Sequence, residues 1–123
     1  MLANSQLIGF VATTDLARSR AFYSEVLGLP IVEESPFACV FDAHGTMLRL
    51  TPVAEMSPAP YTVLGWAVQD IVAATSELSS RGVCFSRYDG MEQDESGIWT
   101  APGGAKIAWF TDPDRNTLSL TQF

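Results

Sequence analysis

Positive charge and histidine are both scarce in this sequence. Its 123 residues include 7 Lys and Arg against 14 Asp and Glu, which gives a formal net charge of −7. Because an acidic chain repels phosphate groups, we expect neither nucleic-acid binding nor binding to an anionic membrane. The single histidine, His44, falls in the turn-like sequence Asp-Ala-His-Gly. One histidine per chain cannot supply an iron centre built from two histidines and a carboxylate.

Cysteines and long apolar runs are also few. Cys39 and Cys84 each fall in an apolar, strand-like pattern, which favours two reduced core residues over a disulfide. No apolar run approaches the ~20 residues of a membrane span. Residues 1–5 lack the basic and apolar regions of a signal peptide, so we expect a cytoplasmic protein. Charged residues make up only 17% of the chain, which suggests that some surface is buried in a homodimer.

What the sequence does contain is an internal repeat of about sixty residues. A glycine followed by an aromatic residue begins a strand-like segment at Gly9 and again at Gly65. Each segment leads to an aspartate, Asp15 and then Asp70, followed by a helical pattern that stops at a glycine. Each copy closes on a Leu-x-Leu-Thr strand. The repeat predicts an α+β fold of two tandem βαβββ modules, residues 1–56 and 57–123.

The elements follow from capping and alternation. An aspartate accepts hydrogen bonds from the first-turn amides of a helix, and a glycine adopts the left-handed conformation that ends one. The helices are therefore expected to run from Asp15 to Gly28 and from Asp70 to Gly82. The expected strands are residues 6–13, 30–34, 37–42, 46–52, 61–68, 83–87, 95–100, 105–111 and 117–122.

Two motifs resemble hallmarks of one family. Residues 15–28, with Phe22-Tyr23 in the middle, are similar to the first helix of the vicinal-oxygen-chelate superfamily. That superfamily contains glyoxalase I, extradiol dioxygenases and the bleomycin- and fosfomycin-resistance proteins. The turn Asp112-Pro113-Asp114 before a hydrophobic strand resembles its other hallmark. The resemblance spans essentially the whole chain. It implies a cup-shaped mixed sheet, with helices on the convex side, ligand on the concave side and a cavity often completed across a dimer.

The resemblance also implies where a metal ion would bind. In metal-dependent members, four strand positions supply His, Glu or Gln ligands, and these correspond here to Ile8, Arg49, Val63 and Ser119. Isoleucine and valine carry no donor atom, a guanidinium repels divalent cations, and a lone serine hydroxyl is a weak ligand. We therefore expect no metal at these positions and no cofactor.

Strand alternation separates the two faces of the sheets. Four leucines are expected to face the helices: Leu48, Leu50, Leu118 and Leu120. The alternate positions are expected to face the cup: Met47, Arg49, Thr51, Thr117, Ser119 and Thr121. Arg49 is either an anchor for a carboxylate or phosphate or a surface or interface arginine paired with an acid. Trp99 and Trp109 either stack on a flat ligand or pack in the core. The candidate ligand-binding residues are Arg49, Ser119, Phe10, Met47, Thr51, Trp99 and Trp109.

These features favour a metal-independent protein that binds a small organic molecule, in a sequestering or resistance-type role. One alternative is a lyase- or isomerase-type enzyme that uses Arg49 without a metal. Another is a glyoxalase- or dioxygenase-like enzyme whose metal site lies elsewhere. The net charge of −7 suits a cationic ligand, whereas Arg49 in the cup suits an anionic one.

Overall fold

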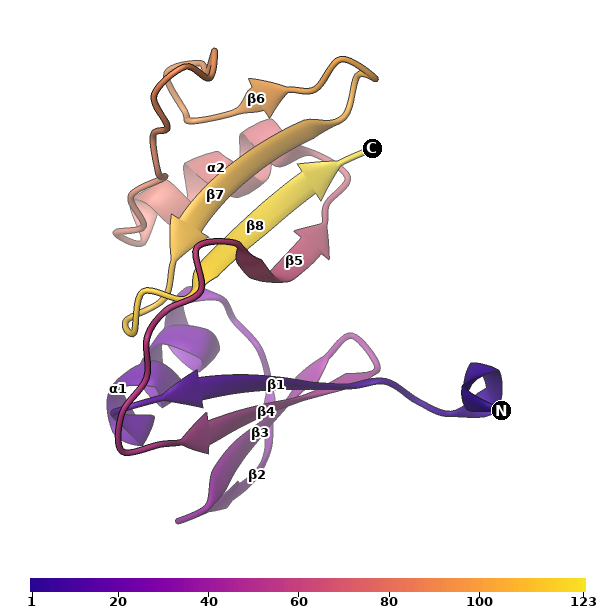
Figure 1. Ribbon diagram of the computed structural model, residues 1–123, viewed down its shortest axis with the longest axis vertical. Helices are drawn as coiled ribbons and strands as arrows, with labels where there is room; N and C mark the ends of the chain where they lie inside the picture. The colour runs from indigo at the N-terminus through magenta and orange to yellow at the C-terminus, as the bar shows by residue number, and fades with distance from the viewer. The chain divides into compact units, whose positions relative to one another are not determined.

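The computed structural model describes residues 1–123, which divide into two units, Met1–Ser57 and Pro58–Phe123. Each unit contains a four-stranded mixed sheet and one α-helix (Figure 1). In each, the order along the chain is strand, helix and three strands. The prediction of an α+β fold with two tandem βαβββ modules is therefore confirmed. Neither helix is long and apolar enough to cross a membrane.

Unit 1 carries a sheet in the order β1-β4-β3-β2. The first strand is parallel to β4, and the other neighbours are antiparallel. Helix α1 contacts β3 and β4, so one face of the sheet is covered by the helix and the other is helix-free. The elements are β1 (Ile8–Thr13), α1 (Leu16–Ala21), β2 (Ile31–Ser35), β3 (Ala38–Ala43) and β4 (Thr46–Pro52).

The first helix changes its winding along its length. Asp15 caps it as predicted, because its Oδ1 accepts a hydrogen bond from the backbone N–H of Arg18 at 3.1 Å. After Ala21 the chain continues as a π-helical turn, Phe22–Val26. The predicted helix to Gly28 is therefore wrong in its last turns, which are wider than an α-helix. The π-helical turn carries Tyr23, which is fully buried.

Buried residues on the helix-covered side form the core of unit 1. Leu48 and Leu50 are 3% and 1% exposed, in line with the predicted alternation. Cys39 lies opposite Leu50 in the strand register, and burial raises the pKa of its thiol. Cys39 and Cys84 are both free, as predicted. The prediction that Cys84 is a core residue is wrong, since its side chain is exposed.

Unit 2 repeats the plan with the strand order β5-β8-β7-β6. Asp70 caps α2 through a 3.0 Å bond from the N–H of Ala73, as predicted. Helix α2 contacts β7 and β8, and Phe110 and Leu118 lie buried on that side of the sheet. The elements are β5 (Thr62–Ala67), α2 (Ile71–Ser80), β6 (Trp99–Thr100), β7 (Lys106–Thr111) and β8 (Thr117–Gln122).

Two predicted strands of unit 2 are not found as expected. Residues 83–87 form no strand, and their one backbone bond to the sheet runs from Ser86 N–H to Trp109 O at 2.7 Å. The strand predicted at 95–100 is reduced to Trp99–Thr100. One reason is that five backbone groups, those of Ser86, Tyr88, Ser96, Gly97 and Ile98, bond to the side chains of Gln93 and Asp94 instead of to a neighbouring strand.

Candidate functional site

The helix-free face of unit 2 collects three of the predicted ligand-binding residues. Trp109 lies directly opposite Ser119 in the β7–β8 register, and Trp99 lies opposite Ile107, two residues from Trp109. Residues directly opposite one another point to the same face of a sheet, and so do residues two apart in a strand. Trp99, Trp109 and Ser119 therefore share the face that α2 does not cover.

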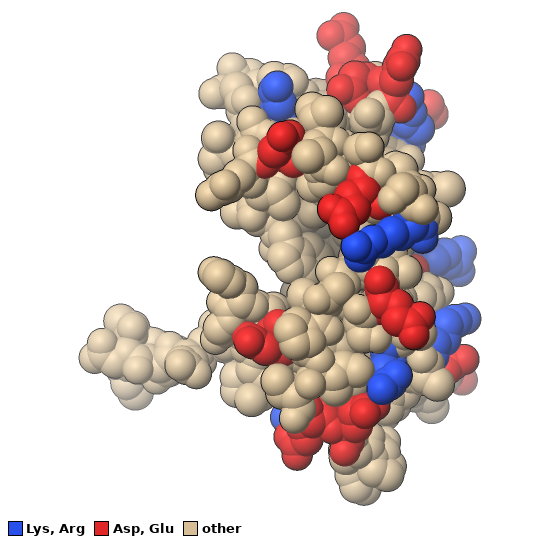
Figure 2. Space-filling model, turned by 180° about the vertical axis from the view of Figure 1, so that it is seen from behind, with Lys and Arg blue, Asp and Glu red and all other residues tan.

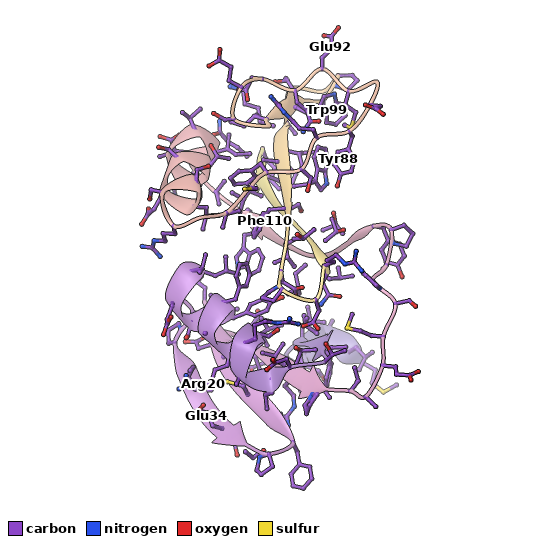
Figure 3. All side chains as sticks on the ribbon, turned by 90° about the vertical axis from the view of Figure 1, so that its left-hand side faces the viewer. Arg20, Glu34, Tyr88, Glu92, Trp99 and Phe110 are labelled. Atoms are coloured by element: carbon purple, nitrogen blue, oxygen red, sulfur yellow. The ribbon has the colours of Figure 1, made fainter.

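The aromatic rings of this face are in contact. The Trp109 ring lies 6.1 Å from the Trp99 ring at an angle of 36°, and 5.5 Å from the Tyr88 ring at 88°. Tyr88 is 41% exposed, and both tryptophans are partly exposed. Tyr88 and Trp99 lie in the same part of unit 2 in Figure 3. We call Tyr88, Trp99 and Trp109 the aromatic face. A planar molecule can stack on such exposed rings.

Sequence reasoning missed Tyr88, because it lies in an expected loop, where alternation assigns no face to a side chain. Its position depends on Gln93, whose side chain connects three points of the loop. The Oε1 atom of Gln93 accepts a bond from the Tyr88 N–H at 2.8 Å. Its Nε2 atom donates to Ser86 O at 2.8 Å and to Gly97 O at 2.9 Å. All the hydrogen-bonding groups of this amide thus hold the loop that presents Tyr88.

Asp94 orders the second half of the same loop. Its Oδ1 atom accepts bonds from the N–H groups of Ser96 and Ile98, both at 2.9 Å. Its backbone oxygen accepts a bond from Nη1 of Arg87. Gly97 follows with φ of 87°, a left-handed conformation that favours glycine. The loop is therefore a defined structure, although it has no regular secondary structure.

Ser119 is more enclosed than the predicted role suggests. Only 7% of the residue is exposed. Gly65 lies beside it on β5, and a Cβ atom added at Gly65 would be 2.9 Å from the Ser119 Oγ. Glycine at position 65 therefore leaves the room that the hydroxyl occupies. Ser119 lies beside Trp109 on the same face of the sheet, but it offers little exposed surface to a ligand.

The other predicted residues lie on the helix-free face of unit 1. Phe10 is opposite Arg49 in the β1–β4 register. On β4, Met47 lies two residues before Arg49 and Thr51 two residues after it, so the three side chains share one face. Phe10 is 65% and Met47 40% exposed, whereas Arg49 and Thr51 are partly exposed. The Arg49 Nη1 lies 4.0 Å from the Met47 sulfur, and Arg49 forms no ion pair. Arg49 is thus not paired with an acid of its own chain, and a pairing with an acid across an interface stays a prediction.

The residues at the four positions that correspond to the family's metal ligands do not fit a metal ion. Ile8 and Val63 are apolar, partly exposed strand residues without donor atoms. Arg49 is a permanent cation, and Ser119 offers one enclosed hydroxyl. Nowhere in the chain do three or more His, Cys, Asp or Glu side chains gather in a way that could hold a metal ion. His44 is exposed on the turn between β3 and β4.

The second family motif serves the turn between β7 and β8. The Asp112 Oδ1 atom accepts bonds from the N–H groups of Asp114 and Asn116, both at 2.9 Å. Its Oδ2 atom accepts a bond from Nδ2 of Asn116 at 2.8 Å. Asp112 is 4% exposed. This carboxylate therefore fixes the turn through three hydrogen bonds.

One exposed ion pair ties α1 to the edge strand β2. Arg20 donates from Nε to Oε1 of Glu34 and from Nη2 to Oε2 at 3.4 Å, and the two side chains lie together in Figure 3. The hydrogen bond from Arg20 lowers the pKa of Glu34. The same bond raises the pKa of Arg20.

Residues 6–120 match the model of the Glyoxalase/Bleomycin resistance protein/Dioxygenase superfamily. The chain belongs to this superfamily. No curated protein matches it.

Solved structures of the same fold cover almost the whole chain. A member of this superfamily from Sphaerobacter thermophilus DSM 20745 is 22% identical over 100% of both chains, with a TM-score of 0.77. A lactoylglutathione lyase from Agrobacterium tumefaciens is 16% identical over 97% of this chain and 93% of its own, with a TM-score of 0.74. TnmS3, an antibiotic binding protein from Streptomyces sp. CB03234, is 22% identical over 99% and 98%, with a TM-score of 0.73. At these identities the likeness concerns the fold.

Proposed function

We propose that this protein binds a small planar organic molecule on the aromatic face, without a metal ion, and so sequesters it. The observation that carries the proposal is the contact of Tyr88, Trp99 and Trp109 on the helix-free face of unit 2. A contiguous patch of exposed aromatic rings is typical of an interaction site. The flat faces of these three partly exposed rings suit a planar ligand. A cytoplasmic homodimer remains part of the proposal.

The residues favour binding over catalysis. The family's metal positions carry Ile8, Arg49, Val63 and Ser119, a set without a carboxylate or an imidazole. The chemistry of metal-assisted enolisation or oxygen activation needs such ligands. The similarity in fold to a protein named as antibiotic binding supports a role in sequestration. A shared fold does not by itself fix a function, so the aromatic face has to be tested directly.

Tryptophan fluorescence offers a direct test. Trp66 lies opposite Leu120 in the register and so belongs to the helix-covered side, away from the aromatic face. A Trp66→Phe variant therefore leaves only Trp99 and Trp109 as reporters. We would titrate this variant with bleomycin, an anthracycline and a naphthalene derivative, and follow quenching together with the melting temperature. A bound ligand quenches the two reporters and raises the melting temperature.

Variants of one ring distinguish stacking from general adhesion. Loss of one stacking contact weakens binding by about 2- to 13-fold, so Trp109→Ala reduces affinity and Trp109→Phe retains most of it. Val72→Ala, on the exposed side of α2, is the matched control and leaves affinity unchanged. If no planar compound quenches the reporters, the proposal is wrong. Turnover of a bound compound would show that the protein is an enzyme and would contradict the sequestering role.

A further inference from the structure

The helix-free face of unit 1 combines apolar side chains with one cation. Ile8, Phe10 and Met47 are 44%, 65% and 40% exposed. They lie on the neighbouring strands β1 and β4, where Ile8 is opposite Met47 and Phe10 is opposite Arg49. Neighbouring strands lie about 5 Å apart, so side chains in these positions are neighbours on the sheet surface. The guanidinium of Arg49 thus sits within an exposed apolar patch.

Arg49 differs in its surroundings from Arg20 and Arg81, which are paired with acids. Arg20 is paired with Glu34, and Arg81 is paired with Glu77 at 2.7 Å. Arg49 has no carboxylate partner, although acidic residues outnumber basic ones by two to one in this chain, 14 against 7. Its polar contact is the sulfur of Met47 at 4.0 Å, which is a weak acceptor. The donors of its planar fork are therefore available to a carboxylate from outside the chain.

We infer that this face binds an organic anion that carries an apolar body, such as an aromatic carboxylate. The guanidinium of Arg49 holds the carboxylate through paired N–H···O bonds. Phe10, Ile8 and Met47 cover the apolar body. The inference rests on residues of unit 1 alone, none of which belongs to the aromatic face, so it goes beyond the function proposed above.

The overall negative charge of the chain makes a preference for anions a specific test of Arg49. A protein of net charge −7 repels anions at long range. A preference for an anion over a neutral molecule of the same shape therefore requires a local cation. Hydrogen bonds to charged groups predict a preference of about 10- to 100-fold.

A matched series of probes measures this preference. We would compare 2-naphthoate, 2-naphthamide and 2-(aminomethyl)naphthalene by titration calorimetry on the full chain. The expected order of affinity is naphthoate, then the amide, then the amine. Arg49→Met removes the preference for naphthoate over the amide, and Arg49→Lys retains part of it. Phe10→Ala weakens binding of both.

Two controls lie in the same unit. Arg20→Met removes an arginine that already has a partner, and Phe37→Ala removes a side chain that is 79% exposed at the turn between β2 and β3. Neither variant changes the ratio of the naphthoate and amide affinities. Circular dichroism and the melting temperature confirm that each variant is folded, since all these side chains are at least partly exposed.

The outcomes separate this inference from the proposed function. Equal affinity for naphthoate and the amide, or an unchanged ratio in Arg49→Met, overturns the inference. Naphthoate binding that is lost in Trp109→Ala but kept in Arg49→Met supports the aromatic face and overturns the site on unit 1. A dimer that dissociates in Phe10→Ala, with no binding of naphthoate, shows that a second copy covers this face and also overturns it.

Discussion

Replacing Gly97 by alanine tests whether the loop before β6 is as closely fitted as the structure indicates. Gly97 is buried and has a φ of 87°. A Cβ atom added there would lie 2.9 Å from the Cβ of Phe85. The Cβ of Phe85 is fixed by the backbone, so no rotation of a side chain can relieve the overlap. Phe85 in turn packs against Phe110, a fully buried core ring, at 5.6 Å.

The expected cost has two parts. The left-handed conformation costs an alanine about 1–2 kcal/mol relative to glycine. Forcing an extra carbon into a packed site adds about 1–3 kcal/mol. Gly90 supplies the matched control, because its φ is 82° and a Cβ atom added there meets no atom within 4 Å. Gly90→Ala therefore contains the conformational part alone.

Urea denaturation of the two variants isolates the steric part. Gly97→Ala is expected to lower the free energy of unfolding by about 1–3 kcal/mol more than Gly90→Ala. It is also expected to weaken the contact of Tyr88 with Trp109, which near-ultraviolet circular dichroism detects. If the two variants lose the same stability, the loop does not pack on Phe85 as described, and the placement of Tyr88 loses its support.

Four further predictions concern stability and assembly. Asp112→Ala removes three hydrogen bonds from a buried turn and lowers the free energy of unfolding by about 2–4 kcal/mol, as urea denaturation measures; a loss below 1 kcal/mol would contradict the role of this carboxylate. Arg115→Gly relieves a φ of 66° and raises stability by up to about 1 kcal/mol, and a loss of stability would argue against strain at this residue. The folded-state pKa of Glu34 lies below its ordinary value of 4.5. The ion pair of Glu34 therefore contributes to stability above pH 4.5, and this contribution is lost as the pH falls through the lowered pKa. Glu34→Gln is expected to flatten this part of the curve of stability against pH, and an unchanged curve would contradict the assignment. The chain is expected to sediment as a homodimer of twice 13.3 kDa, and a species of one chain mass at micromolar concentration would refute that expectation.

The N-terminal segment offers a place to weaken such a dimer. Met1, Leu2 and Leu7 are at least 76% exposed. The segment stands away from the sheet of its own unit in Figure 1, and it carries no charged side chain in Figure 2. Deleting residues 1–6 is therefore expected to weaken the proposed dimer. Equal dimer affinity of the shortened chain would show that this apolar segment does not contribute.

The repeat made the fold predictable because its signals are local. Asp15 and Asp70 cap helices through bonds to residues three positions further on, which a sequence displays directly. The alternation of Leu48 and Leu50 with partly exposed residues likewise reflects the strand geometry itself. Such patterns need no knowledge of distant contacts.

The connection between the expected strands 83–87 and 95–100 is a loop, as predicted, but its two ends were not predictable, for the opposite reason. The apolar alternation of residues 83–87 is typical of a strand, but a strand also needs a neighbour to bond with. Gln93 and Asp94 supply those bonds from their side chains, and this arrangement has no periodic signature. Tyr88 was missed because no local pattern reports its contact with Trp109.

The candidate residues were predicted in part. Alternation predicts that Ser119 faces away from the helix, and the register, which alternation does not give, places Trp109 directly opposite it. The room for the Ser119 hydroxyl depends on Gly65, in a strand more than fifty positions away in the sequence. Arg49 has no carboxylate partner in the chain. This depends on where all the acidic residues lie in the fold, which no local sequence pattern reports.

The hydrogen bonds of Gln93 separate the inside of its loop from its tip. All three end on backbone groups of residues 86–97, so they do not depend on which side chains occupy the tip. Asp89 and Glu92 at that tip are exposed. New ligand preferences can therefore arise by replacing these two residues while the fold stays unchanged. The loop is a self-contained unit for variation, whether by natural divergence or in a library for selecting binders.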